Sequence, residues 1–128
     1  MLDVAIVTYN QENCIAQTIE SVLMQKTNFP FRIIIGEDCS TDNTLQICKS
    51  YAHKYPTKIV LLENAQNIGL VKNYNAVFTA CTAKYLAILE GDDFWTDEYK
   101  LQQQVDILEK HPEVGMAHAH FPFYNNIT

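Results

Sequence analysis

The sequence has only four glycines, and they form neither of the two common glycine-rich phosphate-binding motifs. Neither G-x-G-x-x-G nor G-x-x-x-x-G-K-[ST] occurs, which argues against a nicotinamide site and against a P-loop. Basic residues are few as well: nine Lys and Arg stand against 15 acidic residues, for a net charge of −6. This charge and the lack of a basic cluster argue against a nucleic-acid binder. An anionic ligand would therefore need a metal ion or backbone N–H groups to offset its charge.

Long apolar runs and paired cysteines are also missing. No segment approaches the roughly 18 apolar residues of a membrane span, and the N-terminus lacks the basic region of a signal peptide. The four cysteines follow no C-x-x-C or zinc spacing, so we expect reduced, mostly core-facing thiols. They are Cys14, Cys39, Cys48 and Cys81. We expect a cytoplasmic protein, and a peripheral position at the inner face of the membrane stays open.

The pattern that is present is an alternation of strands and helices in a chain of 128 residues, 48% of them hydrophobic. Short apolar runs predict buried strands, and apolar residues at helical spacing between them predict amphipathic helices. The expected strands cover 4–7, 31–36, 58–63, 85–89 and 114–124. Helices are expected over 13–25, after a cap at Ser40 or Thr41 with Asp42 in the first turn, over 71–81, and from Thr96 or Asp97 to a stop at Pro112. This order predicts an α/β fold, a mostly parallel sheet with helices on both faces.

A polar cluster follows each of the first four predicted strands. The clusters read TYN, GEDCSTD, NAQNIG and EGDD in chain order. Because the carboxyl ends of parallel strands meet at one edge of a sheet, these clusters should converge, and ligands of such sheets bind there. The sequence therefore predicts a ligand site at this edge.

The fourth cluster is part of ILEGDDFW, residues 88–95, in which three carboxylates lie within four positions. Adjacent carboxylates at a strand end can hold Mg²⁺ or Mn²⁺, which prefer oxygen ligands and often share their shell with phosphate groups. Glu90, Asp92 and Asp93 are thus candidates for a cation site, while Phe94 and Trp95 should anchor the turn to the core. The alternative is an N-capping turn before the helix that Thr96 or Asp97 would start.

The other three clusters offer candidate ligand contacts, each with a structural alternative. Asp38 could accept from the N–H of a base, or it could cap the following helix together with Glu37. Tyr9 could stack on a base, or its ring could pack on the first helix. Asn67 with Gly69 could bring the backbone close to a ligand, or form only a loop.

Basic and imidazole side chains give weaker indications. Lys72 lies near the third cluster and could approach a phosphate, although a solvated helix face is an equal alternative. His118 and His120 alternate with alanine on the last predicted strand, so they share one face and could bind a metal. A half-buried or solvated pair is the commoner arrangement, and their role stays open.

Four segments together resemble the N-terminal half of family 2 glycosyltransferases with the GT-A fold. They read VAIVTYNQE, IIIGEDCSTDNT, NAQNIG and YLAILEGDDFWTDEYKLQQQ, in the family's order and spacing, and cover residues 3 to 120. The resemblance implies one GT-A domain over 1–128, the donor-binding part, with the acceptor part absent. It also implies transfer of a sugar from a UDP- or GDP-linked donor to a glycan or lipid-linked acceptor, usually with inversion, in cell-surface polysaccharide biosynthesis. The cofactor would be Mn²⁺ or Mg²⁺.

Residue roles carry over by position in these segments. Tyr9 matches the aromatic residue that flanks the base, and Thr8 and Asn10 beside it are assigned to the donor as well. Asp38 matches the aspartate that contacts the base, and Asn67 and Lys72 are further donor-binding candidates. Of the paired aspartates, Asp92 would contact the ribose or sugar and Asp93 would bind the metal. The general base is expected beyond Thr128.

The sequence departs from the family pattern at two positions. Tyr74 stands where many members carry arginine, which leaves Lys72 as the candidate for a positive charge near the phosphates. Glu90 stands where many members carry another aspartate. Two other functions remain as alternatives: a non-catalytic nucleotide-sugar-binding or interaction module, and a nucleotidyltransferase, which the absence of a glycine-rich basic stretch in TYNQENC disfavours. A homo-oligomer stays open.

Overall fold

The structure is a computed structural model that describes residues 1–111, and within them it contains every helix and strand expected there. The elements are β1 Leu2–Thr8, α1 Ile15–Leu23, β2 Phe31–Glu37, α2 Thr44–Lys54, β3 Ile59–Glu63, α3 Leu70–Ala80, β4 Tyr85–Glu90 and α4 Lys100–Lys110. None of these helices is long and apolar enough to cross a membrane. The predicted strand over 114–124, with His118 and His120, lies outside the described residues.

The four strands form one sheet in the order β3-β2-β1-β4, and all neighbouring strands are parallel. This confirms the predicted parallel sheet. The register places Thr8 opposite Glu37, and Glu37 opposite Glu63. On the other side of β1, Val7 lies opposite Glu90. The four polar clusters therefore start at the same edge of the sheet.

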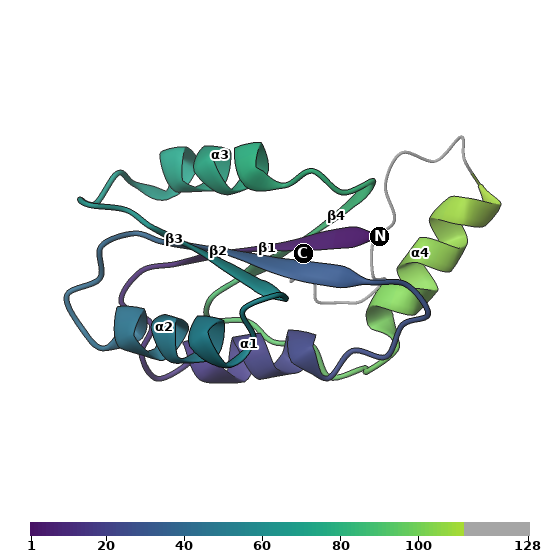
Figure 1. Ribbon diagram of the computed structural model, residues 1–128, viewed down its shortest axis with the longest axis horizontal. Coiled ribbons are helices and arrows are strands. Elements are labelled where there is room, and N and C mark those ends of the chain that lie inside the picture. The colour runs from purple at the N-terminus through teal and green to yellow at the C-terminus, as the bar shows by residue number, and fades with distance from the viewer. Residues whose placement is uncertain (112–128) are drawn as a thin grey trace.

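Helices cover both faces of the sheet, with α3 on one face and α1 and α2 on the other (Figure 1). On the α1–α2 face the core includes Ile6 and Ile33, and Leu101 of α4 joins it. On the α3 face Ile34 packs with Val77. A strand covered on both faces needs apolar residues at successive positions, which explains the unbroken runs in β1 and β2.

Helix α2 begins at Thr44, later than predicted, and neither Ser40 nor Thr41 caps it. Ser40 instead donates both its backbone N–H and its hydroxyl to the buried carboxylate of Glu37. A buried carboxylate needs hydrogen-bond donors, and this need outweighs the capping preference of serine. Asp42, expected in the first helical turn, precedes the helix and accepts from the Thr44 N–H at 2.9 Å.

Helix α4 also begins later than predicted, at Lys100 rather than at residue 96 or 97. The Asp97 carboxylate accepts from the Tyr99 N–H at 2.9 Å and closes a turn before the helix. Upstream of that turn, Trp95 is 8% exposed and joins the core, as predicted, whereas Phe94 is 47% exposed and does not. Consecutive residues of an extended segment point to opposite sides, so only one of the two rings can face the core.

The expectation of mostly core-facing thiols is wrong. All four cysteines are free, but only Cys48 is buried, and Cys14, Cys39 and Cys81 are partly exposed. Cys39 lies in the polar loop after β2 with a φ of +61°. That loop follows the carboxyl edge of the sheet, so its residues cannot all turn toward the core.

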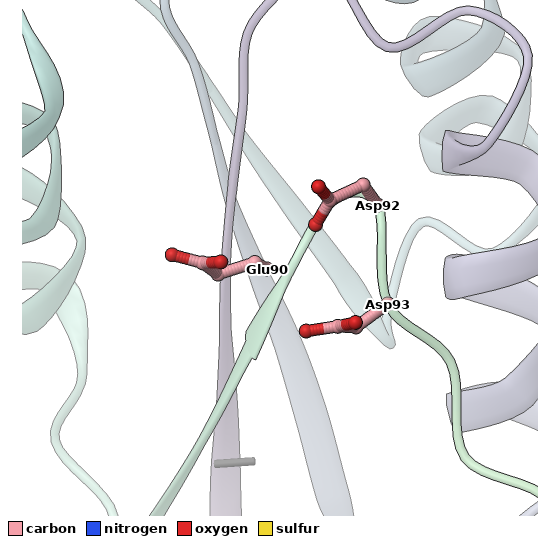
Figure 2. Close-up of side chains that lie close together, drawn as sticks. All are labelled: Glu90, Asp92 and Asp93. Carbon is pink, nitrogen blue, oxygen red and sulfur yellow. The ribbon is translucent and has the colours of Figure 1, made fainter. Parts of the chain in front are cut away.

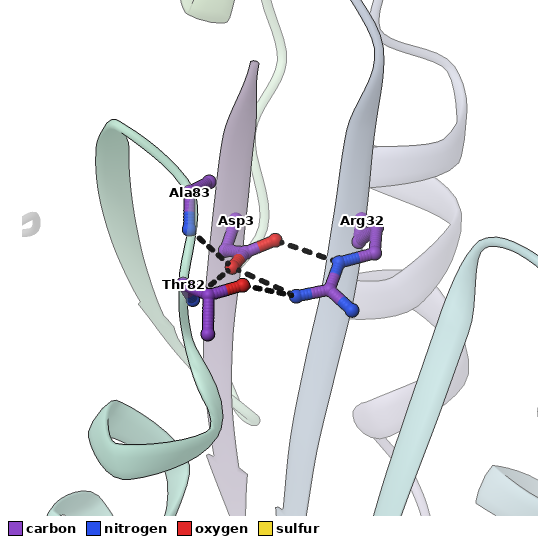
Figure 3. Close-up of polar contacts among 4 residues, drawn as sticks. All are labelled: Asp3, Arg32, Thr82 and Ala83. Atoms are coloured by element: carbon purple, nitrogen blue, oxygen red, sulfur yellow. Dashed lines mark hydrogen bonds and ion pairs between the residues drawn. The ribbon is translucent and has the colours of Figure 1, made fainter.

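The end of the sheet opposite the polar clusters is fastened by Asp3 (Figure 3). Its buried carboxylate accepts from Arg32 Nε at 3.0 Å and from Arg32 Nη2 at 3.1 Å. The backbone N–H groups of Thr82 and Ala83 donate to the same carboxylate at 2.9 and 3.1 Å. Burial alone would raise the pKa of Asp3, but these donors outweigh burial and hold the pKa below its usual value.

Candidate functional site

A pocket of about 310 Å³ opens at the carboxyl edge of the sheet, between the end of β1 and the start of α3. Its volume lies at the small end of the range of ligand sites, roughly 300–1,000 Å³. The lining residues come from the ends of β1, β2 and β4, from the loop before α3 and from α3 itself. They are Val7, Thr8, Tyr9, Gln11, Asp38, Asn67, Gly69, Leu70, Asn73 and Glu90.

The β1 end contributes Thr8 and Tyr9 to this pocket. The Thr8 hydroxyl donates to Gln11 Oε1 at 2.6 Å, which fixes the first residues of the loop. The Tyr9 ring is 43% exposed, so it is not packed away on α1 as the alternative interpretation had it. The ring is therefore available to a ligand at the mouth of the pocket.

Asp38 lies at the pocket wall with 3% of its surface exposed. Its carboxylate accepts from Asn64 Nδ2 at 3.0 Å and from the backbone N–H groups of Ile68 and Gly69 at 2.8 and 3.0 Å. Asn67 donates to the Asp38 carbonyl at 3.1 Å. Asp38 thus holds the loop that precedes α3 in place, and its contact with a base stays a prediction.

Two asparagines that support this wall, Asn64 and Asn73, were not predicted from the sequence. Asn73 is buried, donates to the Gly36 carbonyl at 3.0 Å and accepts from Asn64 at 3.1 Å. A Cβ added at Gly36 would lie 2.4 Å from Asn73 Oδ1, so this contact requires glycine. Asn73 lies one helical turn before the buried Val77 on α3. Helical spacing alone does not distinguish such an inward-facing asparagine from a solvated one.

Three predicted donor-binding residues, Asn10, Lys72 and Asp92, do not line the pocket. The Asn10 side chain turns to the loop after β2, where its Oδ1 accepts from the Thr41 N–H at 2.8 Å. Its own N–H donates to Ser40 Oγ at 2.9 Å, and its φ is +50°. Lys72 is exposed on the first turn of α3. Their donor-binding roles stay predictions, as do those of Thr8, Tyr9, Asp38 and Asn67.

The three carboxylates of the fourth cluster come together at the end of β4 (Figure 2). Glu90, Asp92 and Asp93 each offer an oxygen within 4.8 Å of the others. Burial raises the pKa of Asp93 above its usual value, and the charges of Asp92 and Glu90 raise it further. Like charges held this close gain from a cation between them.

Glu90 joins this cluster to the pocket, since it belongs to the cluster and also lines the pocket. Its Oε2 accepts from the Tyr74 hydroxyl at 3.1 Å. Burial raises the pKa of Tyr74, and the Glu90 charge raises it further, so the hydroxyl stays a donor at neutral pH. Tyr74 is thus a neutral hydrogen-bonding partner of the cluster.

Gly91 lets the acidic turn approach the end of β1. A Cβ at this position would lie 2.2 Å from Gln11 Oε1 and 2.7 Å from Thr8 Oγ1. The Gly91 N–H donates to the Val7 carbonyl at 3.0 Å, and the Asp93 N–H donates to the Glu90 carbonyl at 3.0 Å. The turn that carries the carboxylates is therefore fixed to the strand that forms the pocket floor.

The chemistry of the pocket suits a cation better than a bare anion. Its ten lining residues include two carboxylates and no Lys, Arg or His. Mg²⁺ and Mn²⁺ take carboxylate oxygens and leave further positions for water or phosphate. The three clustered carboxylates fit such an ion, and with it an anionic ligand could occupy the pocket.

Comparison with known proteins places the whole described chain in one family. The sequence model of Glycosyl transferase family 2 matches residues 3–126. The putative glycosyltransferase EpsE of Bacillus subtilis is 39% identical over 103 residues, which are 80% of this chain and 36% of that protein. The chain spans about a third of the length of such curated relatives.

Two solved structures share the fold. The crystal structure of Staphylococcus aureus TarS 1–349 in complex with UDP superposes with a TM-score of 0.75 at 26% identity, over 87% of this chain and 32% of that one. The mannosyltransferase PcManGT of Pyrobaculum calidifontis, in complex with GDP-Man and Mn²⁺, also has a TM-score of 0.75. Its identity is 22%, over 84% of this chain and 32% of that one, so it shows the fold alone.

Proposed function

The chain belongs to glycosyl transferase family 2 and has the N-terminal portion of the GT-A fold, and we propose that it forms the donor-binding part of an inverting, metal-dependent glycosyltransferase. The observation that carries the proposal is that Glu90, Asp92 and Asp93 each offer a carboxylate oxygen within 4.8 Å of the others, and that Glu90 also lines the pocket. The donor is a nucleoside-diphosphate sugar, and the acceptor is a hydroxyl of a glycan or of a lipid-linked glycan.

The proposed donor is supported by the ligands of the structural neighbours. TarS is described in complex with UDP and with UDP-GlcNAc, and PcManGT in complex with GDP-Man and Mn²⁺. In this chain the base would lie against Tyr9 and the wall that Asp38 holds. The diphosphate would then lie toward the acidic turn, where Asp92 faces the ribose or sugar.

The proposed cofactor is Mn²⁺ or Mg²⁺, held by Asp93 with the carboxylates of Asp92 and Glu90 beside it. When bound, the cation would offset the charge of the diphosphate and of the departing nucleoside diphosphate. The protein's own part is to hold three oxygen ligands at the pocket rim. Tyr74 donates to Glu90 and so helps to fix its orientation.

Attack on the donor requires an acceptor hydroxyl and a general base that takes its proton. We propose that this base is a carboxylate C-terminal to Thr128, as in the family that the chain resembles. The Glu90, Asp92 and Asp93 carboxylates are not offered as the base, because the proposed cation occupies them.

Calorimetric titration of the full chain with UDP and with GDP, with and without Mn²⁺, tests the proposal. We expect one of the two nucleotides to bind in Mn²⁺ and its affinity to fall at least about tenfold, about 1.4 kcal/mol, in EDTA. Asp93→Asn should abolish this metal dependence, since it removes a charged ligand of the ion.

Asp106→Asn is the matched control for this substitution. Asp106 is exposed on α4, where it accepts from Gln102 at 2.9 Å, and it lies outside the cluster. This variant should bind nucleotide as the unaltered chain does. The proposal fails if the folded chain binds neither nucleotide in Mn²⁺, or if Asp93→Asn keeps the metal dependence.

A further inference from the structure

Thr18 on α1 contacts the acidic turn from inside the protein. The side chain is 1% exposed, and its hydroxyl lies 2.9 Å from the Gly91 carbonyl oxygen and 2.5 Å from that of Asp93. The carbonyl of Cys14, one helical turn back, is more distant at 3.2 Å. A threonine hydroxyl has one proton to donate, and the shortest of these contacts runs to the backbone of the proposed metal ligand.

The N–H groups and the carbonyls of Gly91 and Asp93 point in different directions, so the carbonyls need a hydrogen-bond donor of their own. The N–H groups of Gly91 and Asp93 are taken up by Val7 and Glu90. The carbonyls of the same two residues turn toward α1, where the Thr18 hydroxyl lies between them. Without this donor, the carbonyl oxygen that it serves would lose its hydrogen bond, and the backbone of the turn would move to regain one.

Movement on the other side of the turn is blocked by β1. Gly91 packs so closely on Thr8 and Gln11 that even a methyl group would not fit. The turn is therefore held between the β1 end and Thr18, and its carboxylates depend on both contacts. A rotation about the N–Cα bond of Asp93 moves its carbonyl and its side chain together, because both are attached to Cα.

A second polar side chain, just beyond the C-terminal end of α1, holds the segment that follows. Gln25, seven residues or about two helical turns beyond Thr18, donates to the Asp97 carbonyl at 2.7 Å. Its Oε1 accepts from the Leu101 N–H at 3.0 Å. Thr18 of α1 and Gln25 after it thus hold the connection from the acidic turn to α4 at both of its ends.

From this geometry we infer that Thr18 is a positioning residue for the cation site: it sets the place of the Asp92 and Asp93 carboxylates without touching the ion. The inference rests on the proposed function, because it concerns how the same turn is held. It goes beyond the proposed function because Thr18, a buried residue of α1, does not line the pocket and yet would affect metal binding.

The test compares Thr18→Val, which keeps the shape and removes the donor, with Thr18→Ser, which keeps the donor. Mn²⁺ binding to the full chain is measured by calorimetry in the presence of whichever of UDP and GDP binds the unaltered chain. We expect Thr18→Val to weaken Mn²⁺ binding by about tenfold or more, the effect typical of residues that support metal ligands. Thr18→Ser should retain the affinity of the unaltered chain.

Val22→Ala separates positioning from general loss of stability. Val22 lies on the same helix, is fully buried in the core and contributes no polar contact to the turn, so the variant should be less stable but bind Mn²⁺ normally. All titrations are made at a temperature where each variant is folded. Normal Mn²⁺ affinity in Thr18→Val, or an equal loss in Val22→Ala, would overturn the inference.

A measurement without ligand distinguishes failure of this inference from failure of the proposed function. Trp95, the single tryptophan, lies two residues after Asp93 and is 8% exposed. Acrylamide should quench its fluorescence more in Thr18→Val than in Thr18→Ser or Val22→Ala. If the unaltered chain binds no Mn²⁺, the proposed function fails, and this comparison alone decides whether Thr18 holds the turn; equal quenching in all variants overturns that role.

Discussion

At the scale of single residues, the acidic side chains at the two ends of the sheet fall into two groups, which differ in whether the protein supplies hydrogen-bond donors to the carboxylate. Asp3 and Asp38 are buried, and each accepts from two backbone N–H groups as well as from a side chain. Such carboxylates are satisfied by the protein itself. The carboxylates of Asp92 and Asp93 lie beside each other and beside Glu90 instead. An external cation would relieve the repulsion between their charges.

Tyr9 provides a prediction at this scale. Stacking of a base on an aromatic ring contributes about 1–3 kcal/mol, so Tyr9→Ala should weaken UDP binding in Mn²⁺ about tenfold or more. The ring is partly exposed and outside the core, so stability should change by no more than about 0.5 kcal/mol. Calorimetry and thermal unfolding measure the two quantities.

Tyr9→Phe is the control, since it keeps the ring and loses only the hydroxyl. We expect it to bind UDP as the unaltered chain does. Tyr9→Ala with undiminished affinity would show that the base does not lie on this ring.

The sequence predicted the acidic turn but not the residues that support it. Asp92 and Asp93 are adjacent in the chain and follow an apolar run, so their pattern is visible locally. Thr18 and Asn73 act across 73 and 37 residues of sequence, on Gly91 and on Gly36. Contacts of this range depend on how the helices pack on the sheet, which no local pattern of polar residues records.

At the scale of elements, β1 and β2 were predictable because a strand buried on both faces is apolar at successive positions. Strand β4 was predictable from its apolar run as well, although Leu86 and Ile88 are exposed rather than buried. The helix starts were not predictable. Ser40 would be a good cap by type, but the buried Glu37 carboxylate uses both of its donors. Helix α4 begins later than predicted for a similar reason, because the Asp97 carboxylate accepts from the Tyr99 N–H and forms a turn before the helix.

The Asp3 contacts give a prediction for pH. The pKa of Asp3 is lowered in the folded chain, so its stabilising effect is complete above the unfolded pKa, about 3.9, and is lost as pH falls through the lower folded pKa. At neutral pH, Asp3→Asn should reduce the free energy of unfolding by about 2 kcal/mol, the size of a charged hydrogen bond. The difference between the two chains should shrink below about pH 4.

Urea unfolding of both chains from pH 7 down to pH 3 measures this effect. The Arg32 side chain is 41% exposed, so its ion pair is partly screened and the Thr82 and Ala83 N–H groups should carry most of the effect. High salt should therefore change the difference only slightly. A difference between the chains that grows on acidification would contradict the assigned pKa direction.

At the scale of the whole molecule, the two ends of the sheet have different tasks. The amino end is fastened by Asp3 and its donors, and the carboxyl end gathers the pocket and the acidic turn. The sheet keeps them apart by the length of β1, Leu2–Thr8. This separation allows changes at one end to be tested with the other as an internal reference.

We propose above all that a divalent cation binds at Glu90, Asp92 and Asp93. Paramagnetic broadening by Mn²⁺ in NMR spectra of the isotope-labelled full chain tests it most directly. Substoichiometric Mn²⁺ should first broaden the amide signals of Gly91, Asp92 and Asp93 and leave those of Thr82 and Ala83 sharp. Broadening that begins at His118 and His120, or that spreads evenly over the chain, would contradict it.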